Sequence, residues 1–122
     1  MLGQAAIALF TLPVSLLAAP FEVSFSQATP TVEAYDYLEV AANVPSPVAP
    51  NPFTNPMLTG SFGRTGFSEH RTVDGFCDSP DGRVFRIRFM PSSPGDYTYS
   101  VTYRQDGVEK THKGAFRATD AR

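Results

Sequence analysis

The stretch Phe85-Arg-Ile-Arg-Phe-Met-Pro-Ser-Ser-Pro-Gly-Asp-Tyr-Thr-Tyr-Ser-Val-Thr-Tyr103 alternates apolar and polar side chains on both sides of a short turn. Positions 85, 87 and 89 are apolar before the turn, and positions 97, 99, 101 and 103 are apolar or aromatic after it. A period of two is typical of strands with one buried face, and the Pro and Gly between them favour a turn. This stretch therefore predicts two antiparallel strands that supply large rings to a core.

Runs of the same kind extend over most of the chain. We expect strands at residues 31–44, 57–63, 71–77, 83–90, 97–103 and 108–118. The proline-rich segment 45–52 predicts a stiff crossover between sheets, and Asp106-Gly107 predicts a tight hairpin turn. No segment has a sustained helical period. The pattern predicts an all-β, immunoglobulin-like antiparallel β-sandwich of six to eight strands.

Size and composition limit the protein to one domain with one core. The chain has 122 residues and a formal net charge of −2, which gives no electrostatic basis for binding nucleic acid or an anionic membrane. Cys77 is the only cysteine, so no intrachain disulfide is expected. A lone cysteine in a strand pattern is expected to be a small buried apolar residue.

The N-terminus has the pattern of an export signal. Residues 5–19 form an uncharged apolar run that is too short to span a bilayer comfortably. A small-x-small cleavage pattern occurs at Ser26-Gln27-Ala28, and an earlier cut after Ala18 or Ala19 is an alternative. We expect a signal peptide at residues 1–28, a single sandwich domain at 29–122, a secreted or periplasmic location, and no membrane span after signal removal. An N-terminal core strand or a misassigned start codon is the competing interpretation.

Candidate catalytic and metal-binding groups do not form a recognisable constellation. Turn geometry explains the Asp and Gly residues of Asp78-Ser-Pro-Asp-Gly82, which lack the ligand spacing of a calcium loop. His70 and His112 have no Gly-x-Ser-x-Gly nucleophile motif to serve. A glycosidase needs two facing carboxylates, and a small sandwich offers no deep cleft between its glutamates. We expect no catalytic residue, no cofactor and no metal ion.

Aromatic side chains outside the strict alternation are the better functional candidates. Exposed rings stack on sugars or pack against neighbouring domains, and the competing interpretation is a plain rim of the sandwich. The residues that we single out for docking or glycan contact are Tyr35, Tyr37, Phe53, Arg64, Phe67 and Arg71.

Four strings of residues, in this order and spacing, resemble a known family. They are Asn51-Pro-Phe-Thr54, Gly75-Phe-Cys-Asp78, Arg86-Ile-Arg-Phe-Met-Pro91 and Pro94-Gly-Asp-Tyr-Thr-Tyr99. Together they resemble the N-terminal immunoglobulin-like domain called domain of unknown function 5060, over residues 30–118. The resemblance implies a sandwich that precedes a glycoside-hydrolase barrel in secreted bacterial proteins. Two departures are the Tyr97 where the family often has Trp, and the chain end at Arg122 where a barrel would begin.

Three functional hypotheses follow from the residues and the resemblance. The first is a non-catalytic accessory domain that packs on a glycoside-hydrolase barrel through rim residues such as Tyr35, Phe53 and Phe67. The second is a free-standing carbohydrate-binding module that contacts a polysaccharide. The third is a cell-surface adhesion domain, which rests on fold analogy alone.

Overall fold

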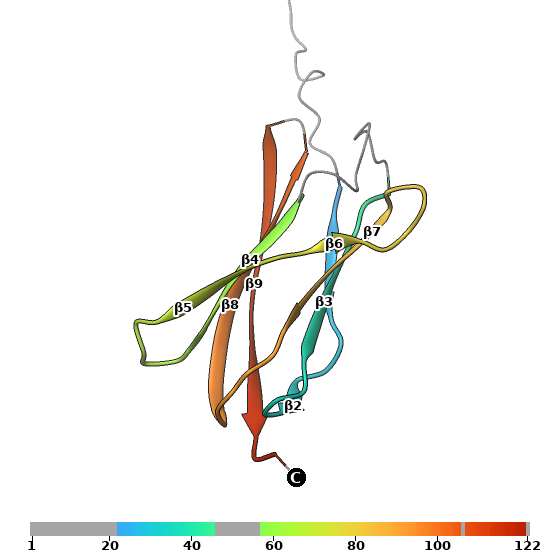
Figure 1. Ribbon diagram of the computed structural model, residues 1–122. Helices are drawn as coiled ribbons and strands as arrows, with labels where there is room; N and C mark the ends of the chain where they lie inside the picture. Colours follow the sequence, from blue (N-terminus) through green and yellow to red (C-terminus); the bar gives the residue numbers. More distant parts are fainter. Residues whose placement is uncertain (1–21, 46–56, 106, 122) are drawn as a thin grey trace, which may run out of the picture.

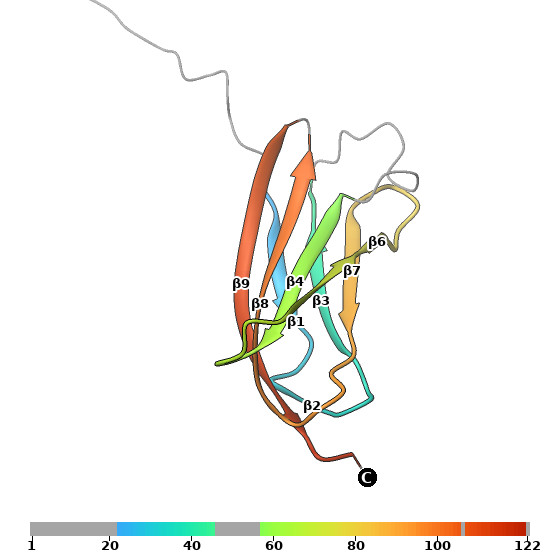
Figure 2. The same cartoon turned by 60° about the vertical axis from the view of Figure 1, so that its left-hand side comes forward.

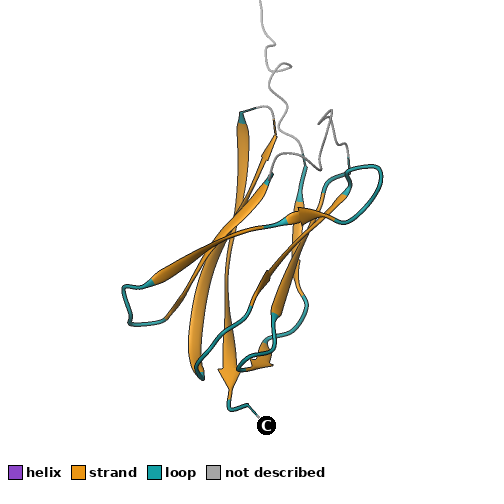
Figure 3. Ribbon diagram, in the orientation of Figure 1, coloured by secondary structure: helices purple, strands orange, loops and turns teal. Residues whose placement is uncertain are grey.

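The computed structural model describes residues 22–45, 57–105 and 107–121, and within these ranges the chain forms strands and no helix (Figures 1 and 3). The strands are β1 (Ser24–Gln27), β2 (Thr31–Glu33), β3 (Leu38–Asn43), β4 (Leu58–Arg64), β5 (His70–Asp74), β6 (Phe76–Cys77), β7 (Val84–Phe89), β8 (Gly95–Gln105) and β9 (Val108–Thr119). Nothing in these ranges is a helix long and apolar enough to cross a membrane. The expected proline-rich crossover lies outside the described residues except for Pro45.

The strands form two sheets that face each other, as the turned view in Figure 2 shows. One sheet has the order β1-β3-β7-β6, and the other has the order β2-β9-β8-β4-β5. The core strands of the two sheets match the two-sheet strand arrangement of an immunoglobulin-like sandwich. The predicted fold class is therefore confirmed. One pairing departs from the antiparallel rule, because β2 runs parallel to β9.

The core lies between the sheets and consists of the side chains that the alternation placed inside. In β3 and β7 every second residue is buried, and in β8 five residues of one phase are buried, with the polar Gln105 as the last of them. These predicted core residues are Leu38, Val40, Ala42, Phe85, Ile87, Phe89, Tyr97, Tyr99, Val101 and Tyr103, and all of them are less than a tenth exposed. The period of two is thus confirmed as the signal that determines the core.

The expected strand at residues 31–44 is in fact two strands in different sheets. β2 pairs with β9 in the five-stranded sheet, whereas β3 pairs with β7 in the four-stranded sheet. Between them Tyr35 has a φ of 72°, which is the left-handed region that non-glycine residues rarely adopt. The prediction of one continuous strand was wrong because this change of backbone direction is not visible in an apolar–polar pattern.

The expected strand at residues 71–77 is also divided between the sheets, at Gly75. β5 pairs with β4, and after Gly75 the chain crosses so that β6 pairs with β7. The Gly75 N–H donates to the Leu58 carbonyl oxygen at 2.7 Å. A Cβ at Gly75 would lie 2.7 Å from the carbonyl oxygen of Arg86, so the crossing requires glycine. With both divisions and β1 included, the described residues contain nine strands, so the predicted count of six to eight was too low.

β1 lies inside the region that the sequence assigns to a signal peptide. It pairs with β3 from Ser24 to Gln27, and the Phe25 ring stacks on His112 with a centroid separation of 5.3 Å. The Tyr99 hydroxyl donates to the side-chain oxygen of Gln27 at 2.5 Å. A cut after Ala28 would remove these contacts, whereas a cut after Ala18 or Ala19 would leave β1 in the mature chain.

We predict that a chain beginning at Glu22 is more stable than one beginning at Thr29. The shorter chain lacks the β1 ladder and leaves the Tyr99 hydroxyl without its Gln27 acceptor, so its free energy of unfolding should fall by about 2 kcal/mol or more. Urea denaturation of both chains measures the difference. Equal stabilities would show that β1 does not contribute to the sandwich.

Candidate functional site

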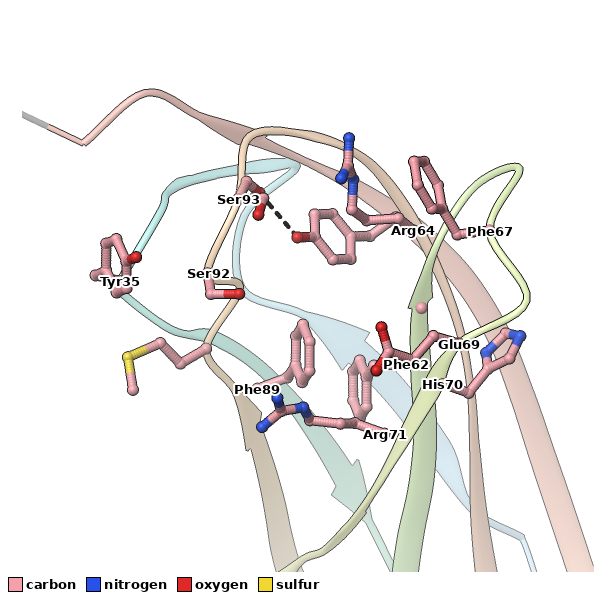
Figure 4. Close-up of a pocket in the computed structure, with 13 residues that line it drawn as sticks. Tyr35, Phe62, Arg64, Phe67, Glu69, His70, Arg71, Phe89, Ser92 and Ser93 are labelled. Atoms are coloured by element: carbon pink, nitrogen blue, oxygen red, sulfur yellow. Dashed lines mark hydrogen bonds between the residues drawn. The ribbon is translucent and has the colours of Figure 1, made fainter.

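One pocket of about 340 Å³ opens at the end of the sandwich where β4 and β7 finish and β8 begins (Figure 4). Loop residues and strand ends from both sheets contribute to it. Its lining consists of Tyr35, Phe62, Gly63, Arg64, Phe67, Glu69, His70, Arg71, Phe89, Met90, Ser92, Ser93 and Tyr97. The volume is in the range of small-molecule sites in proteins, which begins at about 300 Å³.

The floor of the pocket is the apolar core itself. Phe62 of β4 and Phe89 of β7 stack with their centroids 4.6 Å apart and their planes 1° apart. Beside them the Tyr97 hydroxyl donates to the Ser93 carbonyl oxygen at 2.8 Å, which fixes the loop before β8. A ligand in this pocket would therefore rest on buried rings and meet polar groups only at the rim.

Arg64 and Phe67 form a paired unit at the rim. The Phe67 N–H donates to the Arg64 carbonyl oxygen at 3.1 Å, and Gly66 between them has a φ of 88°. This tight turn brings the guanidinium of Arg64 over the Phe67 ring at 4.3 Å from its centroid. Arg64 also lies over Gly95, where a Cβ would be 3.3 Å from its Nε atom.

Tyr35 forms another edge of the pocket and is held there by its backbone. Its N–H donates to the carbonyl oxygen of Pro91 at 2.8 Å, which joins the β2–β3 turn to the loop after β7. The side chain is 67% exposed. A bulky residue in the left-handed region costs free energy, and such positions are found preferentially at functional sites.

The remaining charged groups of the pocket come from the start of β5. Arg71 is exposed, and Glu69 and His70 precede it. Gly63 makes room for His70, because a Cβ at Gly63 would lie 2.6 Å from the His70 Nδ1 atom. The expected strand began at residue 71, whereas β5 begins one residue earlier, at His70. Glu69 is the only acidic residue among the described residues that line the pocket.

The pocket contains the two described arginines that have no carboxylate partner among the described residues. Within the described ranges, five arginines pair with an acidic side chain, at positions 83, 86, 88, 104 and 117. Arg64 and Arg71 form no such ion pair with any described residue, and both line the pocket. The pocket therefore presents guanidinium donors whose charge the described part of the protein does not neutralise.

A second surface lies on the outer side of the four-stranded sheet. The Arg88 guanidinium lies 5.0 Å from the centroid of the Tyr37 ring and 5.1 Å from that of the Phe76 ring. Glu39 accepts hydrogen bonds from Arg88 Nε and Arg86 Nη1, each at 2.8 Å. We call the side chains of Tyr37, Glu39, Phe76, Arg86 and Arg88 the outer-face cluster.

The charges of the outer-face cluster balance when the neighbouring Asp78 is included. Arg86 also donates to Asp78 at 2.6 Å, so each guanidinium has a carboxylate partner. The hydrogen bond from Arg88, with a further contribution from Arg86, lowers the pKa of Glu39 against the opposing effect of burial. Hydrogen bonds to Asp78 and Glu39 raise the pKa of Arg86. The two arginines and their carboxylate partners thus form a closed ionic network, and the exposed Tyr37 and Phe76 rings lie beside it.

The structure divides five of the six residues singled out in the sequence between these two surfaces. Tyr35, Arg64, Phe67 and Arg71 line the pocket, and Tyr37 belongs to the outer-face cluster. Phe53 lies outside the described residues. Met90 and Phe76, which are 57% and 40% exposed, were not among the predicted contact residues. The sequence did contain a signal for both. Phe76 is a large apolar residue on the outward phase of a strand, and Met90 is one just after a strand.

The other reactive groups are occupied with structural contacts. The Cys77 thiol is half-buried and donates to the Ser79 carbonyl oxygen at 3.2 Å. His112 stacks on Phe25 and lies 3.4 Å from the Tyr99 hydroxyl. In the part of the chain that the structure describes, no group of three or more His, Cys, Asp and Glu side chains is arranged to hold a metal ion.

Comparisons with known proteins agree with the fold. A family model described as "Domain of unknown function (DUF5060)" matches residues 31–104. A crystal structure of a "putative glycoside hydrolase" from Bacteroides vulgatus is 27% identical, with a TM-score of 0.57. The similarity covers 76% of this chain but only 17% of that chain, so this chain spans a small part of the Bacteroides protein. A comparison with curated proteins finds no match.

We predict that Tyr35→Asn leaves the fold intact and raises the free energy of unfolding by up to about 1 kcal/mol. Asn tolerates the left-handed region better than Tyr, and the exposed Tyr35 ring contributes little packing. Urea denaturation checks this expectation. A loss of more than about 1 kcal/mol would mean that the ring packs into the structure, in contradiction to its exposure.

Proposed function

The chain belongs to the family of domain of unknown function 5060, and we propose that it is a non-catalytic accessory domain of a glycan-degrading protein. The observation that carries this proposal is the similarity to a small part of a much longer protein described as a glycoside hydrolase. A sandwich that makes up 17% of such a chain leaves most of its length for other domains. The sandwich would then position or assist a catalytic domain.

The arrangement of carboxylates supports a non-catalytic role for this chain. Glycoside hydrolysis requires two carboxyl groups on either side of the scissile bond. Glu39 is held by Arg86 and Arg88, and Glu109 is paired with Arg104. Glu69 has no second acidic residue among the described residues of its pocket. The catalytic carboxylates would therefore come from another domain.

We assign the docking of a catalytic domain to the outer-face cluster. Burial of an unpaired charge at an interface is costly, whereas a charge that already has its hydrogen bonds can be covered at lower cost. Every charge of this cluster has a partner within it or at Asp78, and the Tyr37 and Phe76 rings beside it are 49% and 40% exposed. Aromatic rings and arginine are the side chains enriched at protein interfaces.

The pocket end is less suited to docking on a protein. Covering it would bury Arg64 and Arg71, which have no carboxylate partner among the described residues. The lack of carboxylate partners favours a second role at that end, namely contact with a glycan whose anionic groups would pair with the two arginines.

We also propose that the chain is exported. The apolar run at residues 5–19 and the small residues after it support a signal peptide. Because β1 begins at Ser24, we expect cleavage after Ala18 or Ala19. Mass spectrometry of the exported chain locates the cleavage site. A mature chain that begins at Thr29 would show that β1 is dispensable.

Docking is tested with a catalytic domain from the same source. The reading frame and the neighbouring genes are examined for a glycoside-hydrolase domain, which is then produced separately and mixed with this chain. We predict that the double variant Tyr37→Ser/Phe76→Ser weakens the complex at least about tenfold, because it removes both exposed rings of the proposed interface. Analytical ultracentrifugation measures the dissociation constant.

The matched control is the double variant Tyr35→Ser/Phe67→Ser, which removes two exposed rings at the pocket end instead. The proposal expects it to bind the catalytic domain as the unmodified chain does. If the pocket variant loses binding and the outer-face variant retains it, the assignment of the docking surface is wrong. The accessory role itself fails if the source encodes no such domain, or if the unmodified chain does not bind it.

A further inference from the structure

The pocket brings together arginines without a carboxylate partner among the described residues and exposed apolar side chains of the kind that can pack on sugar rings. Arg64 and Arg71 are the two described arginines without a carboxylate, while the other described arginines are all neutralised in place. Tyr35, Phe67 and Met90 add exposed apolar surface around the same opening. Uncompensated guanidinium groups next to exposed rings indicate a ligand that carries both negative charge and apolar faces.

The two arginines approach the pocket from different sides. Figure 4 shows Arg64 and Phe67 on one side, Arg71 on the other, and Tyr35 at a separate edge. An extended ligand with anionic groups at intervals would engage both arginines and still place its rings near Phe67 and Tyr35.

Other polar groups that line the pocket fit a ligand with hydroxyl groups. Glu69 can accept hydrogen bonds from hydroxyls, and Ser92 can donate or accept them. Sugar rings offer such hydroxyls together with flat C–H faces that pack on aromatic rings. An arginine recognises a carboxylate or a sulfate group through two parallel hydrogen bonds, so it discriminates strongly for anionic groups.

We propose that this pocket binds an acidic glycan, with uronate carboxylates or sulfate esters at Arg64 and Arg71 and sugar rings against Phe67 and Tyr35. The inference deepens the proposed function, because it names the class of glycan that the accessory domain would contact. It is tested on this chain alone and does not need the catalytic domain. Failure of docking and failure of glycan binding are therefore separate results.

The test is isothermal titration of the chain with three oligosaccharides of matched length. One is an oligogalacturonate, one is a sulfated galactan oligosaccharide, and one is a neutral cello-oligosaccharide. We expect binding of at least one acidic ligand and at least about tenfold weaker binding of the neutral one, since a neutral sugar leaves the guanidinium groups unpaired. The acidic ligand that binds identifies the anion as carboxylate or sulfate.

Single variants locate the binding to the pocket. Arg64→Gln and Arg71→Gln should each weaken binding about tenfold, the loss expected for one charge-assisted contact. Arg104→Gln is the matched control, because it makes the same change of charge at the far end of β8, where Arg104 pairs with Glu109. This control should bind as the unmodified chain does. Thermal unfolding of each variant verifies that it is folded.

Several results would overturn the proposal. One is the absence of binding to both acidic ligands at millimolar concentration, and another is equal binding of the neutral ligand. Equal losses in all three arginine variants would indicate non-specific attraction to positive charge. Tighter binding of an oligo-glutamate peptide than of either acidic glycan would assign the pocket to a protein partner instead.

Discussion

The stacking of Phe62 on Phe89 is the contact on which the pocket end of the molecule depends. Phe62 belongs to the five-stranded sheet and Phe89 to the four-stranded sheet, so their rings join the two layers at the end of the core. Phe62 also stacks on Tyr99, and Phe89 lies edge-on to Phe116. Because these rings fill the space between the sheets, the pocket ends on an apolar floor and its charged groups remain at the rim.

Two crossings of the chain between the sheets determine where the candidate functional residues lie. The crossing at Tyr35 places that ring at the pocket edge, and the crossing at Gly75 places Phe76 on the outer side of the four-stranded sheet. Each crossing needs an unusual backbone feature, namely a left-handed tyrosine or a glycine beside a carbonyl oxygen. The fold thus supplies both surfaces from positions that are locally constrained.

The period of two was enough to predict the sandwich and its core, because inward positions such as Ile87 and Val101 depend only on strand alternation. Four of the six selected residues line one pocket, and the two rings among them were identifiable because rings outside the alternation tend to be exposed. The parallel pairing of β2 with β9 and the two crossings were not predictable, because they depend on tertiary contacts such as the bond from Tyr35 to Pro91. The outer-face cluster joins Glu39 and Arg86 across two strands, and a sequence shows no such register.

We propose two separate surfaces. The outer face, whose charges are paired, is for a protein partner, and the pocket, whose two arginines have no described carboxylate partner, is for an acidic glycan. The most direct test is nuclear magnetic resonance of the isotope-labelled chain, with arginine side-chain signals followed during addition of the acidic oligosaccharide. The account predicts that the signals of Arg64 and Arg71 shift while those of Arg86 and Arg88 stay in place. Shifts confined to Arg86 and Arg88, or no shift at Arg64 and Arg71, would contradict it.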